Sequence, residues 1–324
     1  MVKYMDMDNY YDGYKSSELN CIDLPIGAAA GFYHRDNYFY YCFAYCLFMN
    51  FFLNYQADWL ESRNRILDSL GLCLDAVSVQ EANLLDQIKK CLDEEKPVIM
   101  IVKYGSLFYS RYYGWGTFNH ALLLSDYNDT YELIGVRDRE AVKEHIENGH
   151  FSSDIMHRIT LKYEHIHTIW KESERQFAVE QLPYQGRIFC IRKSKEASLG
   201  LEEILRNAWK QEPVKNMLWE YAKSRAENPE AYTDQETEAM RRSYYRSFLP
   251  FFELLEKKLP WKEDGRKEYV AVKEMFLKER MHAINGIQLE LMRGQKGSRA
   301  LEALCSRDME CTGKLLDFLH RLSE

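Results

Sequence analysis

The sequence predicts an α+β protein in which a mixed domain with an antiparallel sheet, over residues 1–195, precedes a mainly helical region, over residues 196–324. Two observations predict this division. In the first part, short apolar runs of strand length alternate with helical segments, and residues 118–138 have the pattern of an antiparallel hairpin. In the second part, long segments keep a helical pattern and β-rich runs are few.

The elements of the mixed domain follow from periodicity and from helix breakers. Residues 84–92 have helical periodicity, and a proline separates them from an apolar strand over residues 98–102. Residues 155–171 alternate in the manner of a strand, and residues 187–192 form the strand that closes the domain. The apolar run 38–55 is rich in tyrosine and contains asparagine, which favours a buried helix over a membrane span.

In the C-terminal region, glycine provides the breaks between helices, at Gly265 and again over residues 294–297. Between these breaks the apolar residues recur at helical spacing. The helices expected there span residues 199–212, 214–226, 234–259, 267–293 and 300–323.

The hairpin carries the most informative residues of the chain. His120 opens one apolar strand and Asp138 closes the next, while residues 125–130 between them are typical of a tight turn. Antiparallel pairing would bring the imidazole and the carboxylate to the same end of the ladder, where the acid can hold the base in one tautomer. Asp126 and Asp129 compete for this role, but both lie in the predicted turn, where aspartate is common.

Cys21 is the candidate nucleophile. The residues that follow it are small and apolar and predict a helix that begins at or just after the thiol, with Pro25 tolerated in its first turn. The unpaired N–H groups at a helix start favour a thiolate and can bind an oxyanion. Alternatively, Cys21 is a small core residue, because free cysteine is commonly buried and the chain has eight cysteines.

The order Cys21, His120, Asp138 is typical of papain-like enzymes, and the wider layout resembles the papain-fold cysteine enzymes of thiotemplated natural-product biosynthesis. These include butirosin-type acyltransferases and, closer in layout, closthioamide-type amide synthases. Papain-like peptidases place a glutamine shortly before the cysteine, and no glutamine precedes Cys21. The resemblance is carried by residues 20–21, 35–43, 97–102, 119–121 and 136–138.

The resemblance implies a papain-like catalytic domain with Cys21 as nucleophile, His120 as base and Asp138 as orienting acid. It further implies an acyltransferase or amide synthase that moves an acyl group from a carrier-protein thioester, through an acyl-cysteine, to a small amine or polyamine. Phosphopantetheine would arrive on an acyl or peptidyl carrier protein, and no cofactor or metal is implied. The helical region would be a lid, a carrier-docking surface or a dimer interface. A cysteine hydrolase with the same triad and a noncatalytic binding module are the alternatives.

The missing glutamine leaves the oxyanion donor to the backbone, to Asn20 or to a remote group. The aromatic and glycine-rich tract before the hairpin, with Tyr104, Tyr109 and Trp115, suggests a loop that lines the cleft and stacks on an acyl chain. Asn119 is also assigned to this oxyanion and substrate-binding set. A tyrosine-rich packed loop is the alternative.

Composition limits the remaining possibilities. The net charge of −7 and the absence of a basic stripe argue against nucleic-acid binding. The polar, acidic N-terminus has no signal-peptide pattern and the cysteines lack framework spacing, which predicts a reduced cytoplasm. Cys42 and Cys46, and likewise His165 and His167, could form metal-binding pairs, but no second pair completes a site.

Overall fold

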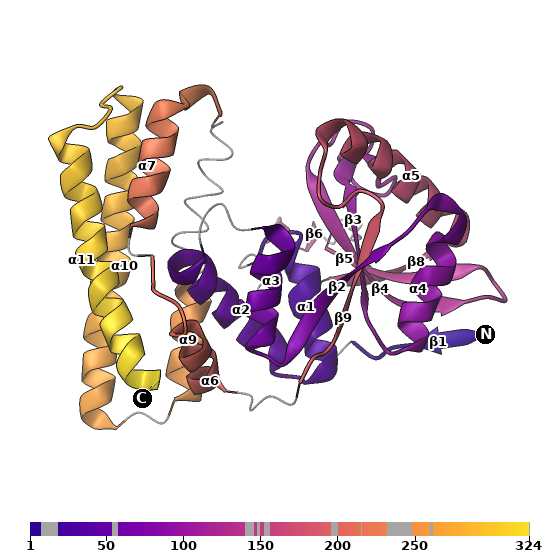
Figure 1. The fold of residues 1–324 in the computed structure, drawn as a ribbon, viewed down its shortest axis with the longest axis horizontal. Helices are drawn as coiled ribbons and strands as arrows, with labels where there is room; N and C mark the ends of the chain where they lie inside the picture. The colour runs from indigo at the N-terminus through magenta and orange to yellow at the C-terminus, as the bar shows by residue number, and fades with distance from the viewer. Residues whose placement is uncertain are drawn as a thin grey trace. The chain divides into compact units, whose positions relative to one another are not determined.

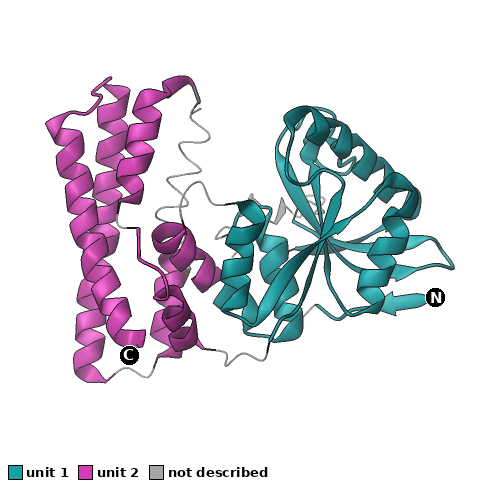
Figure 2. Cartoon of the chain, in the orientation of Figure 1, with its two compact units in different colours: residues 1–41, 58–197 teal, residues 42–57, 198–324 magenta. Residues whose placement is uncertain are grey.

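The computed structural model describes most of the chain, in two compact units (Figure 2). Unit 1 consists of residues 1–41 and 58–197, and unit 2 of residues 42–57 and 198–324. The sequence predicted one boundary near residue 195, whereas the segment 42–57 groups with the C-terminal helices. The described residues are 1–7, 19–53, 58–139, 146–147, 150–151, 156–195, 200–214, 216–231, 248–259 and 262–323.

A seven-stranded antiparallel sheet forms the centre of unit 1 (Figure 1), which confirms the predicted α+β class. Each pair of neighbouring strands is antiparallel. The strands lie in the order β2 (Leu72–Ser78), β9 (Arg187–Lys193), β3 (Val98–Lys103), β4 (Asn119–Asn128), β5 (Leu133–Asp138) and β8 (His157–Lys162), with β1 (Val2–Tyr4) paired to the end of β4 and a separate ribbon of β6 (Ile146–Glu147) and β7 (His150–Phe151).

β4 and β5 form the predicted hairpin, but its turn lies further along the chain than expected. Residues 125–128 belong to β4, and the chain reverses over residues 129–132. The register shifts at Ser125, an extra residue that forms a bulge. The polar residues here suggested a turn because the sequence did not reveal their partners. Asp126 in particular forms an ion pair with Arg158 of β8, which satisfies its charge within the sheet.

Helices pack against both faces of the sheet (Figure 1). α1 (Asp23–Tyr33) packs against β3, β4 and β9, and α4 (Leu84–Asp93) packs against β3 and β4. α5 (Tyr163–Glu180) packs against β3, β5 and β8. α3 (Trp59–Asp68) packs against β2 and begins with a side-chain cap, in which Asp58 accepts a hydrogen bond from the third residue of the helix. Two short 3₁₀ turns, η3 (Glu81–Asn83) and η4 (Tyr104–Ser106), complete the described elements of this unit.

The two faces of the sheet can be told apart at the end of β3. The Lys103 ammonium reaches Glu180 of α5 at 2.6 Å, so the side chain of Lys103 points to the α5 face. Its neighbour Val102 pairs with His120 of β4. Because successive side chains in a strand point to opposite faces, His120 lies on the face opposite α5. This is the face that α1 covers.

α5 replaces the second half of the strand predicted over residues 155–171. β8 ends at Lys162 and the helix begins with the next residue, so His165 and His167 lie on a helix rather than on one strand face. A few residues here alternate in polarity, which mimicked a strand. The longer pattern is helical, because the buried residues recur three or four positions apart. They are Ile166, Ile169, Trp170, Ser173 and Phe177.

Unit 2 is helical in all its described elements, as the sequence predicted for the C-terminal region. The tyrosine-rich apolar run forms the buried α2 (Asn37–Leu47), which starts in unit 1, and the π-helical turn η2 (Phe48–Phe52). Of the helix predicted over residues 234–259, the part before residue 248 lies outside the described residues. The remaining elements are α6 (Leu201–Ala208), α7 (Met217–Glu227), η5 (Pro229–Ala231), α9 (Phe248–Lys258), α10 (Glu263–Met292) and α11 (Arg299–Ser323).

Glycine ends α10 as predicted but does not precede it. Gly294 follows the helix with a φ of 73°, a left-handed conformation that glycine adopts without strain. Gly265, expected to be a break, lies inside the first turn of the helix. A glycine is tolerated there because the first turn contributes few intrahelical hydrogen bonds.

A buried ion pair joins the two long helices of unit 2. Arg280 of α10 contacts Asp308 of α11 at 2.8 Å, and both side chains are about 2 % exposed. The guanidinium also lies over the rings of Phe248 and Phe276, at 5.9 and 5.5 Å from their centres. A buried pair of this kind costs desolvation and fixes how the helices pair rather than adding much stability.

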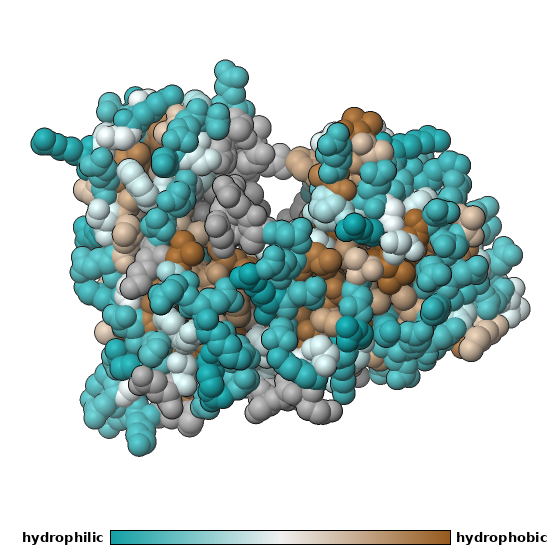
Figure 3. Space-filling view, in the orientation of Figure 1, coloured by the Kyte–Doolittle hydropathy of each residue, from teal (hydrophilic) through white to brown (hydrophobic). Residues whose placement is uncertain are grey.

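The visible surface of both units carries mainly hydrophilic side chains, with smaller hydrophobic patches between them (Figure 3). Within the described ranges, no helix has the length and hydrophobicity needed to cross a membrane.

Candidate active site

Cys21 lies in the turn that leads into α1, which begins at Asp23, so the helix starts just after the thiol as the sequence predicted. The turn before the helix is held by Asn20, whose side-chain oxygen accepts hydrogen bonds from the N–H groups of Ile22 and Asp23, both at 2.9 Å. The backbone carbonyl of Asn20 accepts a third hydrogen bond, from Leu24, at 3.0 Å. The thiol itself is partly exposed, whereas the small residues that follow it are buried and let the helix approach the sheet closely.

His120 and Asp138 meet on one face of the hairpin, as predicted. Leu123 pairs with Arg137 in the ladder, so Asp138 lies diagonally across from His120 on the same face. The imidazole Nε2 lies 2.6 Å from the carboxylate Oδ1, and both side chains are at most 1 % exposed. The second carboxylate oxygen accepts a hydrogen bond from the hydroxyl of Tyr109 at 2.7 Å.

Cys21 interacts with the same imidazole. Burial lowers the pKa of His120, but the charge and hydrogen bond of Asp138, with a further contribution from Cys21, raise it to about 10. Because Nε2 contacts Asp138, the buried Nδ1 is the nitrogen that remains for the thiol. Among the described residues, no group lies in hydrogen-bonding geometry with Nδ1. The thiol instead donates to the backbone carbonyl of Asn119 at 3.3 Å. Catalytic hydrogen bonds are often long or misdirected before a substrate binds.

A row of aromatic rings leads outward from the imidazole. The ring of Tyr104 lies 4.2 Å from that of His120, centre to centre. Tyr112 follows at 5.1 Å from Tyr104, and Trp115 at 5.0 Å from Tyr112. Trp115, predicted to bind substrate, is 64 % exposed and reaches the catalytic residues through the other rings. The predicted set therefore comes together in part: Tyr104 and Tyr109 contact the catalytic pair, and Trp115 ends the row.

Asn119 contributes to the site through its backbone. Its carbonyl accepts the thiol hydrogen bond, while its side chain points to the face opposite His120 because neighbouring strand residues alternate. The amide nitrogen of Asn20, the other predicted asparagine, donates to Asp23 at 2.6 Å. Asn20 thus holds the backbone of the turn that carries the thiol, and Asn119 holds the thiol itself through its backbone carbonyl.

The aromatic loop is pinched at its base by two glycines. The N–H of Gly105 donates to the carbonyl of Gly116 at 2.8 Å. A Cβ built on Gly105 would lie 2.8 Å from that same oxygen, and a Cβ on Gly116 would lie 2.8 Å from the Cβ of Tyr104. Lys103 adds a hydrogen bond to the carbonyl of Thr117 at 3.1 Å. These contacts fix the rings of the loop relative to β3 and β4.

The sequence analysis missed a buried polar cluster beneath the nucleophile. Asp23, which is fully buried, forms two hydrogen bonds with the guanidinium of Arg63, at 2.9 and 2.7 Å. Tyr41 donates to the same carboxylate at 2.8 Å, and the amide of Asn20 completes the set. Arg63 lies forty positions further along the chain, on a helix with no distinctive motif, so no local signal indicated its role.

The competing carboxylates of the hairpin lie at its other end and are neutralised by cations. Asp126 contacts Arg158 at 2.7 Å. Asp129 contacts Lys89 at 2.6 Å and accepts a hydrogen bond from Tyr163 at 2.9 Å, and these contacts lower its pKa to about 2. Neither can orient His120.

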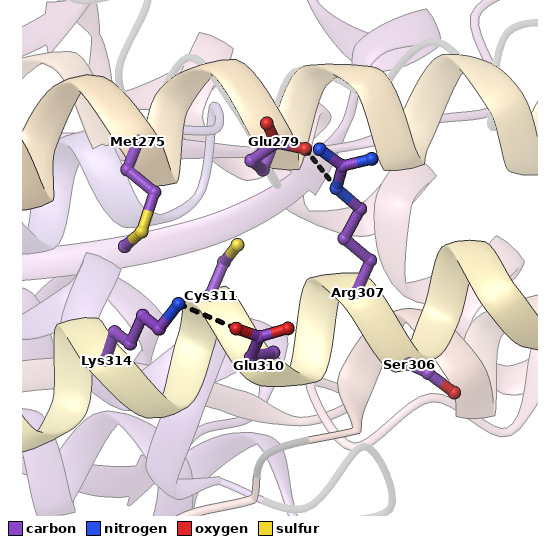
Figure 4. A pocket seen from close by; sticks show the side chains of 7 residues that line it. All are labelled: Met275, Glu279, Ser306, Arg307, Glu310, Cys311 and Lys314. Atoms are coloured by element: carbon purple, nitrogen blue, oxygen red, sulfur yellow. Dashed lines mark hydrogen bonds and ion pairs between the residues drawn. The ribbon is translucent and has the colours of Figure 1, made fainter.

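A groove between α10 and α11 in unit 2 carries no comparable chemistry (Figure 4). Its two acidic side chains are each paired across or along the groove, Glu279 with Arg307 and Glu310 with Lys314. Over the described ranges, no three His, Cys, Asp or Glu side chains gather as they would around a metal ion.

Comparisons with known proteins give a distant structural neighbour. No family model matches the chain, and no curated protein matches its sequence. A crystal structure from Bacillus anthracis, whose description proposes a C39-like peptidase, aligns with 60 % of this chain and 99 % of its own. The sequences are 10 % identical over this alignment and the TM-score is 0.32.

Proposed function

We propose that the protein is a cysteine-dependent acyl-transfer enzyme with Cys21 as nucleophile, His120 as general base and acid, and Asp138 as the orienting carboxylate. The observation that carries this proposal is the buried His120–Asp138 pair, which lies beside a partly exposed thiol at a helix start. A carboxylate on Nε2 fixes the ring so that the other nitrogen can exchange a proton with sulfur. We also propose that unit 1 is a papain-like fold, since the nucleophile helix precedes the strand pair that carries the base and the acid.

In the proposed reaction, the thiolate of Cys21 attacks the carbonyl carbon of an acyl thioester while His120 holds the thiol proton as imidazolium. The tetrahedral adduct collapses by breaking the bond to the departing thiol, which takes the proton from His120. The product is an acyl thioester on Cys21 with a neutral imidazole beside it. An amine then attacks this carbonyl, its proton passes to His120, and the amide leaves as the thiolate is restored.

The finer proposal is an amide synthase that accepts the acyl group from a carrier protein. The acyl-cysteine keeps the group activated, so the outcome depends on which nucleophile reaches it. The aromatic row from Tyr104 to Trp115 supports a subsite for an apolar or aromatic acyl group, since such rings bind flat apolar surfaces and displace water. We propose unit 2 as the surface for the carrier protein or for a second copy of the chain.

Intact-protein mass spectrometry tests the proposal. The wild type, Cys21→Ala and Cys73→Ala are exposed to a model acyl thioester with and without an amine, and the products are identified. Cys73 is the matched control because it is another partly exposed thiol. We expect an acyl adduct on the wild type and on Cys73→Ala but none on Cys21→Ala, and amide as the product when amine is present.

The products separate the alternatives. Carboxylic acid as the sole product in the presence of amine would identify a hydrolase with the same triad. If neither acylation nor preferential alkylation of Cys21 occurred, the site would be a noncatalytic one.

A further inference from the structure

Within the described part of the chain, the hydrogen bonds of the nucleophile turn leave one backbone N–H group without an acceptor. The N–H groups of Ile22 and Asp23 donate to the side-chain oxygen of Asn20, both at 2.9 Å. That of Leu24 donates to the Asn20 carbonyl, and the N–H of Cys21 is the one that remains. A side-chain oxygen just before a helix commonly satisfies its first N–H groups in this way. The orientation of the Asn20 side chain therefore decides which N–H group is left for the carbonyl oxygen of a substrate.

Asp23 determines how the Asn20 side chain is oriented. A carboxamide has a donor end and an acceptor end of similar shape, so it can be turned over unless its partners differ. The Asn20 nitrogen donates to the Asp23 carboxylate at 2.6 Å, and an ionised carboxylate can only accept. The Asn20 oxygen is therefore the end that faces the N–H groups of the turn.

Arg63 is the group that allows a carboxylate to be buried at this point. Its Nε donates to Oδ1 of Asp23 at 2.9 Å and its Nη2 donates to Oδ2 at 2.7 Å. Two parallel hydrogen bonds from one guanidinium fix both the position and the plane of the carboxylate, which a single-point cation does not do. Tyr41 adds a third hydrogen bond, to Oδ1 at 2.8 Å. Without Arg63 the carboxylate would be buried without a cation.

α3 anchors Arg63 to the edge of the sheet. The side chain of Asn64 accepts a hydrogen bond from the N–H of Leu74 at 2.6 Å and donates to its carbonyl at 3.0 Å. Leu74 belongs to β2, an edge strand of the described sheet, so these bonds replace those that a further strand would make. Asp58 caps the start of the same helix, and the ring of Trp59 lies 5.5 Å from the guanidinium. The guanidinium thus has a fixed place before any substrate binds.

We infer that Arg63 is a positioning residue for the nucleophile. Through Asp23 it orients Asn20, and through Asn20 it shapes the turn so that the thiol and the N–H of Cys21 face the same substrate carbonyl. The inference rests on the proposed acyl transfer, in which this N–H binds the oxyanion. A buried ion pair adds little stability compared with apolar packing, so geometry is the property that this pair supplies. No proton moves along these hydrogen bonds.

The test compares two reactions of the same thiol in Arg63→Met and in Asp23→Asn. Acylation by a benzoyl thioester of N-acetylcysteamine passes through an oxyanion, whereas alkylation by iodoacetamide displaces iodide and forms none. We expect single-turnover acylation at saturating thioester to fall by about 10²-fold, as a displacement of about 1 Å can cause, and alkylation to stay within about threefold of wild type. The thioester concentration that gives the half-maximal rate should change little, because the acyl group binds elsewhere, on the aromatic row.

A double-mutant cycle tests whether Arg63 acts through Asp23. If it does, Asp23→Asn/Arg63→Met should lose no more acylation than the more damaging single variant, because the second change removes an interaction that is already broken. Losses that multiplied in the double variant would show that Arg63 acts by another route, and the inference would be wrong.

Arg280→Met is the matched control, because it breaks another buried arginine–aspartate pair, in unit 2. It should lower the melting temperature and keep both rates per folded molecule. Arg63→Lys provides a second variant in case Arg63→Met does not fold. Lysine keeps the charge but makes only one of the two hydrogen bonds, so acylation should fall by about tenfold, the equivalent of one such bond.

The outcomes separate this inference from the proposed function. Unchanged acylation per folded molecule in the Arg63 variants, an equal loss of acylation and alkylation, or the same loss of acylation in Arg280→Met would overturn the inference and leave the acyl transfer in place. A wild type that is alkylated at Cys21 but never acylated would refute the proposed function itself, and the inference with it.

Discussion

Both ends of the hairpin formed by β4 and β5 carry a buried carboxylate, but the two are neutralised by different groups. At one end Asp126 pairs with Arg158, a cation that keeps its charge at any ordinary pH. At the other end Asp138 pairs with His120, which can gain or lose a proton. The same local chemistry thus stabilises the sheet at one end and prepares a proton transfer at the other. The thiol lies beside the end that titrates.

The strongest way to separate the two ends is to remove the cation at each. We expect His120→Ala to lower the rate of Cys21 acylation by more than about 10³-fold. The thiol loses the base that takes its proton, and the thiolate loses the imidazolium charge that stabilises it. Arg158→Ala should leave the rate per folded molecule unchanged and lower the melting temperature. The measurements are single-turnover acylation and thermal unfolding. Equal loss of acylation in both variants would show that the ends do not differ in function.

Asp138→Asn sharpens the comparison by changing the charge and keeping the shape. In the wild type the raised pKa keeps His120 protonated up to about pH 10, so the imidazolium is lost as the pH rises through that value. Without the Asp138 charge, burial dominates and the pKa falls. We expect acylation to drop by about 10²–10⁴-fold and the alkaline limb of its pH profile to move toward neutral pH. A limb that stayed near pH 10 would contradict the assigned partner.

The features that the sequence predicted are local ones. The helix start at Cys21 and the meeting of His120 with Asp138 follow from short-range spacing, and both are found as expected. The aromatic loop also had a local signal, and two of its three named residues contact the catalytic pair, Tyr109 directly through Asp138 and Tyr104 through its ring.

The features that escaped prediction depend on partners far along the chain. The turn was placed too early because Asp126 finds Arg158 on another strand, which lets a polar residue remain in β4. Arg63 of α3 binds Asp23 beside the nucleophile turn, and no spacing rule connects it to Cys21. The segment around His165 was predicted as a strand because a short alternation of polar and apolar residues does not reveal the helical period of 3.6 residues.

Gly135→Ala tests how closely the structural end is packed. A Cβ at Gly135 would lie 2.0 Å from the Asp126 carboxylate, so the ion pair or the backbone must move. We expect a loss of about 1–3 kcal/mol in the free energy of unfolding, measured by denaturant titration, with acylation by the folded protein unchanged. Gly313→Ala in α11 is the control, because nothing lies within 4 Å of its Cβ, and it should be neutral or stabilising. Similar losses at both positions would argue against the close contact.

Tyr109→Phe removes the hydrogen bond that the Tyr109 hydroxyl donates to Asp138 at the catalytic end. The Tyr109 hydroxyl donates to the oxygen of Asp138 that does not face His120, so its loss leaves a buried carboxylate less well solvated. We expect acylation to fall by about tenfold, the equivalent of roughly 1.4 kcal/mol for a hydrogen bond to a charged group. Tyr112→Phe keeps the ring row without touching Asp138 and should have a smaller effect on the rate. A larger loss in Tyr112→Phe would mean that the rings, rather than the carboxylate, control the rate.

Asp129→Asn gives the smallest expected effect, at the structural end. The folded-state pKa of Asp129 is lowered to about 2 by Lys89 and Tyr163, below its ordinary value. A lowered pKa contributes stability that is present above the unfolded-state value and is lost as the pH falls through the folded-state value. The melting temperature of the wild type should therefore fall slightly more than that of Asp129→Asn between about pH 4 and pH 2. The variant has no carboxylate at this position that could take up a proton. Above that window the difference in melting temperature between the two proteins should not change with pH. A difference that instead grew toward alkaline pH would exclude Asp129 as its source.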